Sequence, residues 1–231
     1  MTEQSTPLHD VKFPNEGTAY RDARNELLIA ERELRRQVER VAALRRTLPP
    51  GGTIPEDYVF DEAPHDQARR RVRFSELFGD KPTLITYSFM FGPDDASPCP
   101  LCTSILDGLD GTSGHVTQRV AFAVIAKSPI ERIMRHAGDR GWRQLRLLSS
   151  SGNSFNRDYR GEDEEGSQTP SLNVFTRDGG VVRHAYNTEL FFVAPDSGQD
   201  PRHVDLIWPL WSLLDVTPEG RGTDWRPKLR Y

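Results

Sequence analysis

Residues 82–109 read PTLITYSFMFGPDDASPCPLCTSILDGL and hold both cysteines of the chain, Cys99 and Cys102. The apolar, β-branched and aromatic run 82–91 predicts a buried strand. The apolar residues of 105–109 have the spacing of a helix face. The order strand, loop, C-x-x-C, helix therefore predicts an α/β sheet with the cysteine pair beyond the carboxyl end of a strand, where such sheets place reactive groups.

The two cysteines form one C-x-x-C unit, Cys99-Pro100-Leu101-Cys102. On a first helical turn the two sulfurs can reach each other, and the helix N-terminus favours thiolate over thiol. This spacing predicts reversible dithiol–disulfide exchange. Two alternatives stay open, half of a zinc site or a pair of buried small apolar residues. Zinc usually takes four ligands, however, and the chain has no second C-x-x-C and only an isolated His115 nearby. We therefore expect neither a metal nor a cofactor.

A second landmark lies farther along the chain. Thr169-Pro170 precedes an apolar run at 171–175, a glycine-containing turn at 177–180 and a further strand that opens at Val181. A proline is permitted at the first position of a strand. The C-x-x-C after a strand and the Thr-Pro before a hairpin together resemble the thioredoxin fold. The resemblance implies that the Thr169–Pro170 bond is cis, and that both residues shape a substrate groove facing the dithiol.

The insert between these landmarks resembles the peroxiredoxin branch of that fold. It predicts a strand, a short helix and a second strand, at residues 119–126, 130–137 and 145–148. Ser128 is expected to cap the helix, with Pro129 at its first position. The peroxidatic motif P-x-x-x-[TS]-x-x-C is not satisfied, because Pro93 and Ser97 are followed by Pro100 where the cysteine should stand.

Several segments recur in one bacterial family: His9–Pro14, Leu48–Gly52, Pro55–Phe60, Tyr87–Gly92, Cys99–Ser104, Ser151–Asn153, Asn156–Tyr159 and Asp200–His203. On these motifs the chain resembles, over nearly its whole length, the thioredoxin-like domain-of-unknown-function family described as predicted dithiol-disulfide oxidoreductases. The resemblance implies an α/β fold with a thioredoxin-like central mixed sheet flanked by helices.

Composition limits the partners. The net charge of −4 and the pI near 5.9 argue against a general nucleic-acid surface. The start of the chain, residues 1–7, has neither the basic start nor the apolar core of a signal peptide. No apolar run approaches the roughly 20 residues of a membrane span. We therefore expect a cytoplasmic protein that binds neither membrane nor nucleic acid.

Two domains are expected, an N-terminal helical arm at 1–52 and a thioredoxin-like domain with a C-terminal helix and tail at 53–231. Alternating spacings of four and three give the arm a heptad stripe: Ala23, Leu27, Ala30, Leu34, Gln37, Val41, Leu44 and Leu48. Such a stripe favours a homodimer through this helix or a helix strapped along its own domain. Near the C-terminus, 206–214 predicts a short apolar helix capped by Asp205, whose tryptophans Trp208 and Trp211 are core residues or a substrate wall.

A polar segment contains Asn153, Asn156 and Arg157, between two predicted strands. It is either a substrate-binding loop near the dithiol or an exposed connection. The sequence as a whole predicts a thiol–disulfide oxidoreductase: Cys99 attacks a disulfide-containing protein or small-thiol substrate, Cys102 resolves the mixed disulfide, and a cellular thiol reductant recycles the pair. The alternatives are a non-catalytic redox-responsive or dimeric binding module, and a thiol peroxidase without the standard peroxiredoxin motif.

Overall fold

A computed structural model describes residues 8–64, 68–197, 202–222 and 224–230. Residues 1–7, where no signal peptide is expected, and Asp200 and Pro201 of the last family motif lie outside the described residues. The chain divides into two units, one ending at Pro49 and one beginning at Pro50. Each unit is described by itself.

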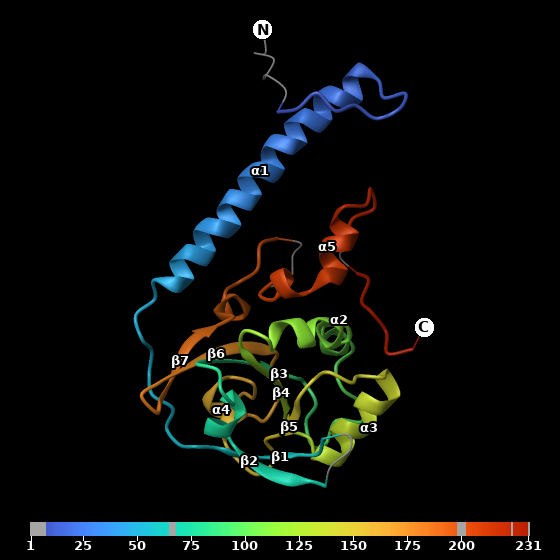
Figure 1. Cartoon of the computed structure of the whole chain (residues 1–231). Helices are drawn as coiled ribbons and strands as arrows, with labels where there is room; N and C mark the ends of the chain where they lie inside the picture. The colour runs from blue at the N-terminus through green and yellow to red at the C-terminus, as the bar shows by residue number, and fades with distance from the viewer. Residues whose placement is uncertain (1–7, 65–67, 198–201, 223, 231) are drawn as a thin grey trace. The chain divides into compact units, whose positions relative to one another are not determined.

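The first unit contains one long helix, α1, over Thr18–Arg46 (Figure 1). The predicted N-terminal helix is therefore confirmed, although Leu48 lies beyond its end. No residue of α1 is buried, and Leu27, Leu34 and Leu44 of the heptad stripe are exposed. The pairing of two such helices stays a prediction.

The described part of the second unit forms a seven-stranded mixed sheet of order β2-β1-β5-β4-β3-β6-β7. The strands are β1 (Val59–Glu62), β2 (Arg70–Arg73), β3 (Thr83–Ser88), β4 (Ala121–Ala126), β5 (Leu147–Ser149), β6 (Ser171–Asp178) and β7 (Val181–Asn187). Strands β3, β4 and β5 run parallel, whereas β6 and β7 continue the sheet antiparallel beyond β3. This central order, with a helix connecting β3 to β4, is the thioredoxin-like α/β fold, so the predicted fold class is confirmed.

Helices cover both faces of the sheet: α2 (Pro100–Val116), α3 (Ile130–Arg140), α4 (Phe155–Asp158), α5 (Pro209–Asp215) and the 3₁₀ turns η1 (Phe74–Phe78), η2 (Glu189–Phe192) and η3 (Asp205–Ile207). Successive side chains of a strand point to opposite faces. On β4, Phe122 and Val124 accordingly pack in a core with α2, α3 and α5, while Ala123 and Ile125 pack in a second core with η1 and α4. Tyr87 of β3 points to the first face, toward α2.

Two local expectations are wrong. Ser128 does not cap α3, because Pro129 occupies the cap position and no side chain caps this helix. The Ser128 amide donates to Phe91 O (2.8 Å) and its carbonyl accepts from Ser149 Oγ (2.7 Å). These bonds hold Ser128 at the ends of the strands, one residue before the cap position of α3. The C-terminal helix is likewise broken at Trp208, because a proline disfavours helical backbone in the residue before it.

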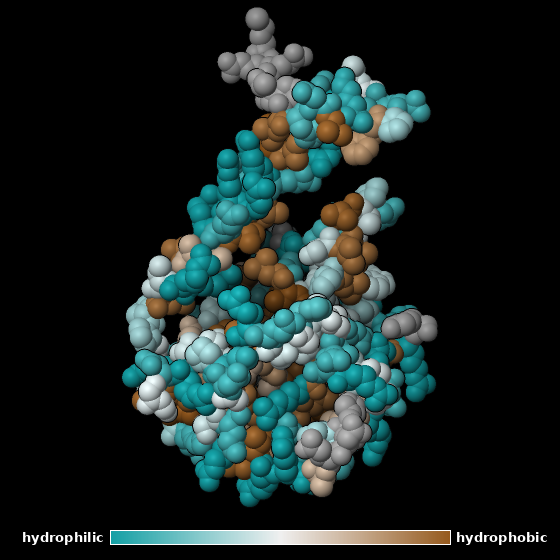
Figure 2. Space-filling view, viewed as in Figure 1, coloured by the Kyte–Doolittle hydropathy of each residue, from teal (hydrophilic) through white to brown (hydrophobic). Residues whose placement is uncertain are grey.

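The segment that carries η2, η3 and α5 bears exposed apolar side chains: Leu190, Phe192, Val193, Leu206, Leu213 and Val216. Figure 2 shows apolar residues along α5 on the face viewed. Within the described residues, none of the helices is both long enough and apolar enough to span a bilayer.

Candidate functional site

The two cysteines lie where β3 delivers the chain to α2. Cys99 is the N-cap residue of α2, with Pro100 at the first helical position, and Cys102 lies within the first turn. A proline suits that position because the first amides of a helix have no intrahelical partner. The Cys99 amide donates to Met90 O (3.0 Å), which fixes the entry to the helix. Both residues are free thiols; Cys99 is partly exposed, whereas Cys102 is buried.

The two cysteines differ in the pKa of their thiols. The Cys102 S–H donates to the Cys99 sulfur and, with the backbone amides of Leu101 and Cys102, lowers the pKa of Cys99 to about 6 against the opposing effect of burial. The hydrogen bond to Cys99 and burial raise the pKa of Cys102 well above its usual value. At neutral pH, Cys99 is therefore mainly a thiolate and Cys102 a thiol.

A buried tyrosine touches the inner cysteine. Tyr87 Oη donates to Cys102 Sγ at 3.3 Å, and Tyr87 is fully buried. Burial raises the pKa of Tyr87 well above its usual value, so the phenol keeps its proton. A negative charge that forms on Cys102 therefore has a neutral donor already in place.

An arginine holds the loop in front of the pair. The Arg132 guanidinium of α3 donates to the carbonyls of Gly92, Pro93 and Asp95, and it lies 4.7 Å from the centre of the Phe91 ring. These contacts fix the backbone of residues 92–95, which lie between β3 and α2 and lead to Cys99. Arg132 was not predicted from the sequence, because an arginine at this position of a short helix is typical of a solvent-facing residue.

Thr169 and Pro170 lie immediately before β6 and line the same cavity as Cys99 and Cys102. The expected cis bond between them is wrong, since the described residues contain no cis peptide bond. Thr169 is held from both sides: its amide donates to Gly161 O (3.0 Å) and its hydroxyl to Arg160 O (2.9 Å). These contacts bring the chain to β6 in the trans form, which X-Pro bonds favour by about 0.5–1 kcal/mol.

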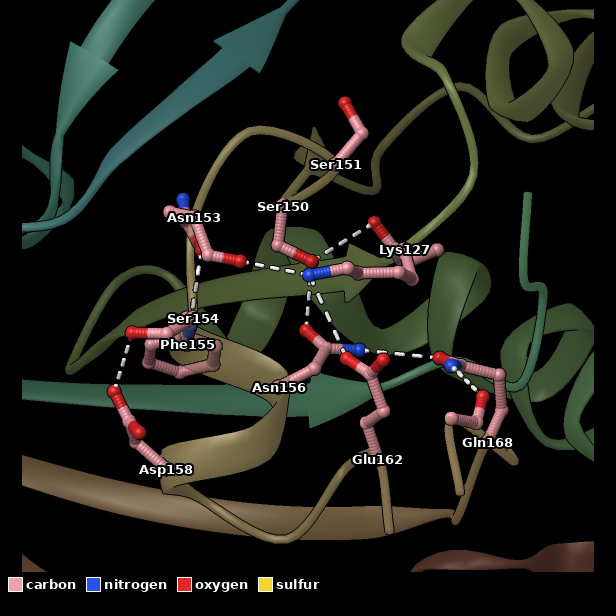
Figure 3. A network of polar contacts seen from close by, with 12 residues as sticks. Lys127, Ser150, Ser151, Asn153, Ser154, Phe155, Asn156, Asp158, Glu162 and Gln168 are labelled. Carbon is pink, nitrogen blue, oxygen red and sulfur yellow. Dashed lines mark hydrogen bonds and ion pairs between the residues drawn. The ribbon is translucent and has the colours of Figure 1, made fainter. Parts of the chain in front are cut away.

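The polar segment contains the helical turn α4, and Asn153, Asn156 and Arg157 do not line this cavity. Asn156 is fully buried; its amide oxygen accepts from Ser150 Oγ (2.7 Å) and its amide nitrogen donates to Gln168 Oε1 (3.3 Å). The Asn153 side-chain amide donates to Val59 O (2.8 Å), and the Asn153 backbone carbonyl accepts from Lys127 Nζ (2.7 Å). Figure 3 shows Asn156, Lys127 and Gln168 turned toward one another.

Arg157 is exposed. Asn153 and Asn156 therefore support the backbone that leads to Thr169, and we do not propose any of the three as substrate-binding residues.

Asn156→Ala is expected to lower the free energy of unfolding by about 1–3 kcal/mol, because it leaves buried partners without their hydrogen bonds. Arg157→Ala, the matched exposed control, is expected to change it by less than about 0.5 kcal/mol. Urea unfolding measures both values. Equal effects of the two substitutions would contradict the structural role assigned to Asn156.

Tyr87, Trp208 and Trp211 also line the cavity beside the dithiol. Both tryptophans are also buried in the first core, as the expectation of core residues requires, and their role as a substrate wall stays a prediction. The signal for Tyr87 was its place near the end of the strand before the cysteine loop, but a tyrosine there is equally typical of a core. In the described part of the chain, no three His, Cys, Asp or Glu residues gather as metal ligands would.

Several solved structures are similar to this chain. AhpC of Enterococcus faecalis is 16% identical, with 71% of this chain and 91% of that chain covered and a TM-score of 0.48. The reduced 2-Cys peroxiredoxin of Plasmodium vivax is 17% identical over 68% and 95%, with a TM-score of 0.45. Peroxidoxin BcpB of Mycobacterium tuberculosis is 16% identical over 70% and 95%, with a TM-score of 0.43. At these identities, the reaction has to be argued from this chain's own residues.

A comparison with curated proteins finds no significant match. The family described as bacterial protein of unknown function (DUF899) matches residues 11–231, which is nearly the whole chain. The family that the sequence motifs resemble is thereby confirmed, and the chain belongs to this bacterial family.

Proposed function

We propose that the protein is a thiol–disulfide oxidoreductase with Cys99 as nucleophile and Cys102 as resolving thiol. One observation carries the proposal: Cys99 is the partly exposed N-cap residue of α2 and Cys102 follows it in the first turn, where a hydrogen bond from the Cys102 S–H lowers the pKa of Cys99 to about 6. The thiolate is the reactive form of cysteine. The same contact supplies a reactive thiolate and a second thiol within reach of it.

In the first step, the Cys99 thiolate attacks one sulfur of a substrate disulfide RS–SR′. A bond forms between Cys99 Sγ and the RS sulfur, the S–S bond of the substrate breaks, and R′S⁻ leaves and takes a proton from water. The product is a mixed disulfide between Cys99 and RS. No net oxidation has occurred, because one disulfide has replaced another.

In the second step, Cys102 loses its proton and attacks Cys99 Sγ. The Cys99–Cys102 disulfide forms, and the leaving RS⁻ takes up the proton that Cys102 lost. The substrate disulfide has gained two electrons and two protons: the cysteine pair supplied both electrons and the Cys102 proton, and water supplied the other proton. The Tyr87 O–H already points at Cys102 Sγ and stabilises its developing charge. A cellular thiol reductant returns the pair to the dithiol.

A steady-state assay tests the proposal against its alternatives. Catalysis predicts many turnovers of bis(2-hydroxyethyl) disulfide per protein with glutathione or reduced thioredoxin as reductant. A redox-responsive module predicts one oxidation event per chain and a change in assembly. Turnover of hydrogen peroxide without turnover of any disulfide would replace the proposal by a thiol peroxidase.

Tyr87→Phe is expected to slow the second step roughly tenfold, because it removes the donor to the Cys102 thiolate while leaving attack by Cys99 unchanged. Rapid-mixing kinetics with a chromogenic disulfide separate the two steps. Tyr58→Phe is the matched control: its hydroxyl donates to Asp158 Oδ2 (2.7 Å) in the second core, away from the dithiol. Equal resolution rates in the two variants would exclude this role of Tyr87.

A further inference from the structure

The cavity beside the dithiol is the size of a small-molecule site. It has a volume of about 880 Å³, and its lining includes Cys99, Cys102 and described residues of η2, η3 and α5. Binding sites for single organic molecules span about 300–1,000 Å³. A loop of a folded protein would need free space over the nucleophile, whereas here residues of this chain, among them His203 and Trp208, line the cavity together with both sulfurs.

The lining next to the sulfurs is apolar. Met90, Leu101 and Ile105 belong to it, and so do the indoles of Trp208 and Trp211. The Trp208 Nε1–H donates to Ser104 Oγ (3.0 Å), so the polar atom of this ring already has a partner. The wall therefore presents hydrocarbon and aromatic surface to an occupant.

Apart from the Cys99 thiolate, the charged residues of the lining balance one another. Among the described residues they are Arg202, Arg221, Arg226, Asp196, Asp205 and Asp215. Four of them form one network, in which Arg221 binds Asp205 (3.1 Å) and Asp215, and Arg202 binds the same two carboxylates (2.5 and 3.4 Å). The network leaves no excess charge of either sign, and an ionised ligand would lose its water without gaining an oppositely charged surplus.

A single histidine adds polar character. His203 lines the cavity, and its Nδ1 lies 3.2 Å from Thr188 Oγ1. Burial lowers the pKa of His203 to about 4, so the ring is neutral at pH 7. The histidine thus offers a hydrogen bond without adding charge.

We propose that this cavity binds a low-molecular-weight organic disulfide that has no net charge and an apolar or aromatic body. The inference rests on the proposed thiol–disulfide exchange and names its substrate class. The disulfide bond lies against Cys99, and the organic body packs against the tryptophan wall.

The experiment measures binding with a Cys99→Ser, Cys102→Ser double variant, so that no exchange takes place. Isothermal titration compares 4,4′-dithiodipyridine, which is neutral at pH 7.5, with 5,5′-dithiobis(2-nitrobenzoate), an aromatic disulfide with two carboxylates. We expect the neutral probe to bind at least about tenfold more tightly, since the dianion must be desolvated without compensation. Equal or tighter binding of the dianion, or no binding of the neutral probe, would overturn the inference.

A substitution that fills the cavity tests whether the probe binds there. Met90→Trp in the double variant places an indole in the cavity and is expected to weaken binding of the neutral probe by at least about tenfold. Met134→Trp is the control, because Met134 packs against the same core from α3 but does not line the cavity. Circular dichroism checks that both variants fold. Loss of binding in Met134→Trp alone would place the ligand elsewhere and contradict the inference.

The two proposals fail in different ways. If the double variant prefers the neutral probe but the wild type shows no exchange, the binding inference stands and the proposed function falls. If the wild type turns over protein disulfides but the double variant binds neither probe, the proposed function stands and the substrate class is wrong.

Discussion

Cys99→Ser is expected to abolish disulfide exchange, whereas Cys102→Ser is expected to accumulate a stable mixed disulfide with a small thiol. The difference follows from position: Cys99 is the partly exposed N-cap of α2 and lines the cavity, while Cys102 is buried behind it. Only Cys99 reaches a substrate, and only Cys102 can release it. This is the largest expected effect, because each variant stops the reaction at a different step.

Intact-mass measurement after incubation with bis(2-hydroxyethyl) disulfide reads the outcome. The Cys102→Ser protein is expected to gain one mercaptoethanol group, and the Cys99→Ser protein none. The pKa of Cys102 is raised by its hydrogen bond to Cys99 and by burial. In the Cys99→Ser protein, burial still raises the pKa of Cys102 and keeps it a thiol. Trapping by Cys99→Ser in place of Cys102→Ser would reverse the two roles.

Alkylation of Cys99 by iodoacetamide is expected to rise with pH through a midpoint near 6, where the Cys99 thiolate forms. At pH 6 about half of this thiol is ionised, compared with about one part in a thousand for a cysteine of pKa 9. A thiolate of low pKa is intrinsically less nucleophilic, which reduces the advantage to roughly 20-fold. A stopped assay of alkylation against pH measures the midpoint.

Substitutions at Cys102 supply the control, since the Cys102 S–H is the largest cause of the low pKa. Cys102→Ala removes this donor and is expected to raise the midpoint, whereas Cys102→Ser keeps a hydroxyl donor and is expected to raise it less. A wild-type midpoint near 9 would contradict the assignment of Cys99 as the thiolate.

The same shift sets the pH dependence of stability for the reduced protein. The pKa of Cys99 is lower in the folded chain than the usual 9, so the thiolate favours the folded state fully above pH 9. This contribution decreases as the pH falls from 9 toward 6 and is lost below 6. Because the disulfide form lacks the thiolate, we expect the pair to be a stronger oxidant than one with an ordinary Cys99 pKa.

The sequence predicts the elements of the central sheet because the apolar runs at 82–91, 119–126 and 171–175 are short, β-branched and bounded by turn residues. Strands β1 and β2 were not predicted, because each has only four residues and β2 is arginine-rich with only Val72 buried. Their place is set by pairing with each other and with β5, which local sequence does not encode.

Some residues of the candidate site can be identified from the local sequence, whereas others come together only through the fold. Cys99 and Cys102 stand in one local motif, so the sequence alone identifies them. Tyr87 meets Cys102 across 15 positions, and the wall from Trp208 meets α2 across about a hundred, so both contacts depend on the fold. The trans bond before Pro170 depends on hydrogen bonds from Thr169 to residues 160 and 161, which no local pattern indicates.

A redox titration of the wild-type protein tests the central claim most directly. The protein is equilibrated in glutathione buffers of stepped ratio, quenched with acid and weighed by intact-mass spectrometry. We expect one transition, in which the monomer loses two hydrogens as Cys99 and Cys102 form an intramolecular disulfide. Disulfides only between chains, or a sulfinic acid at Cys99 with Cys102 unchanged, would contradict it.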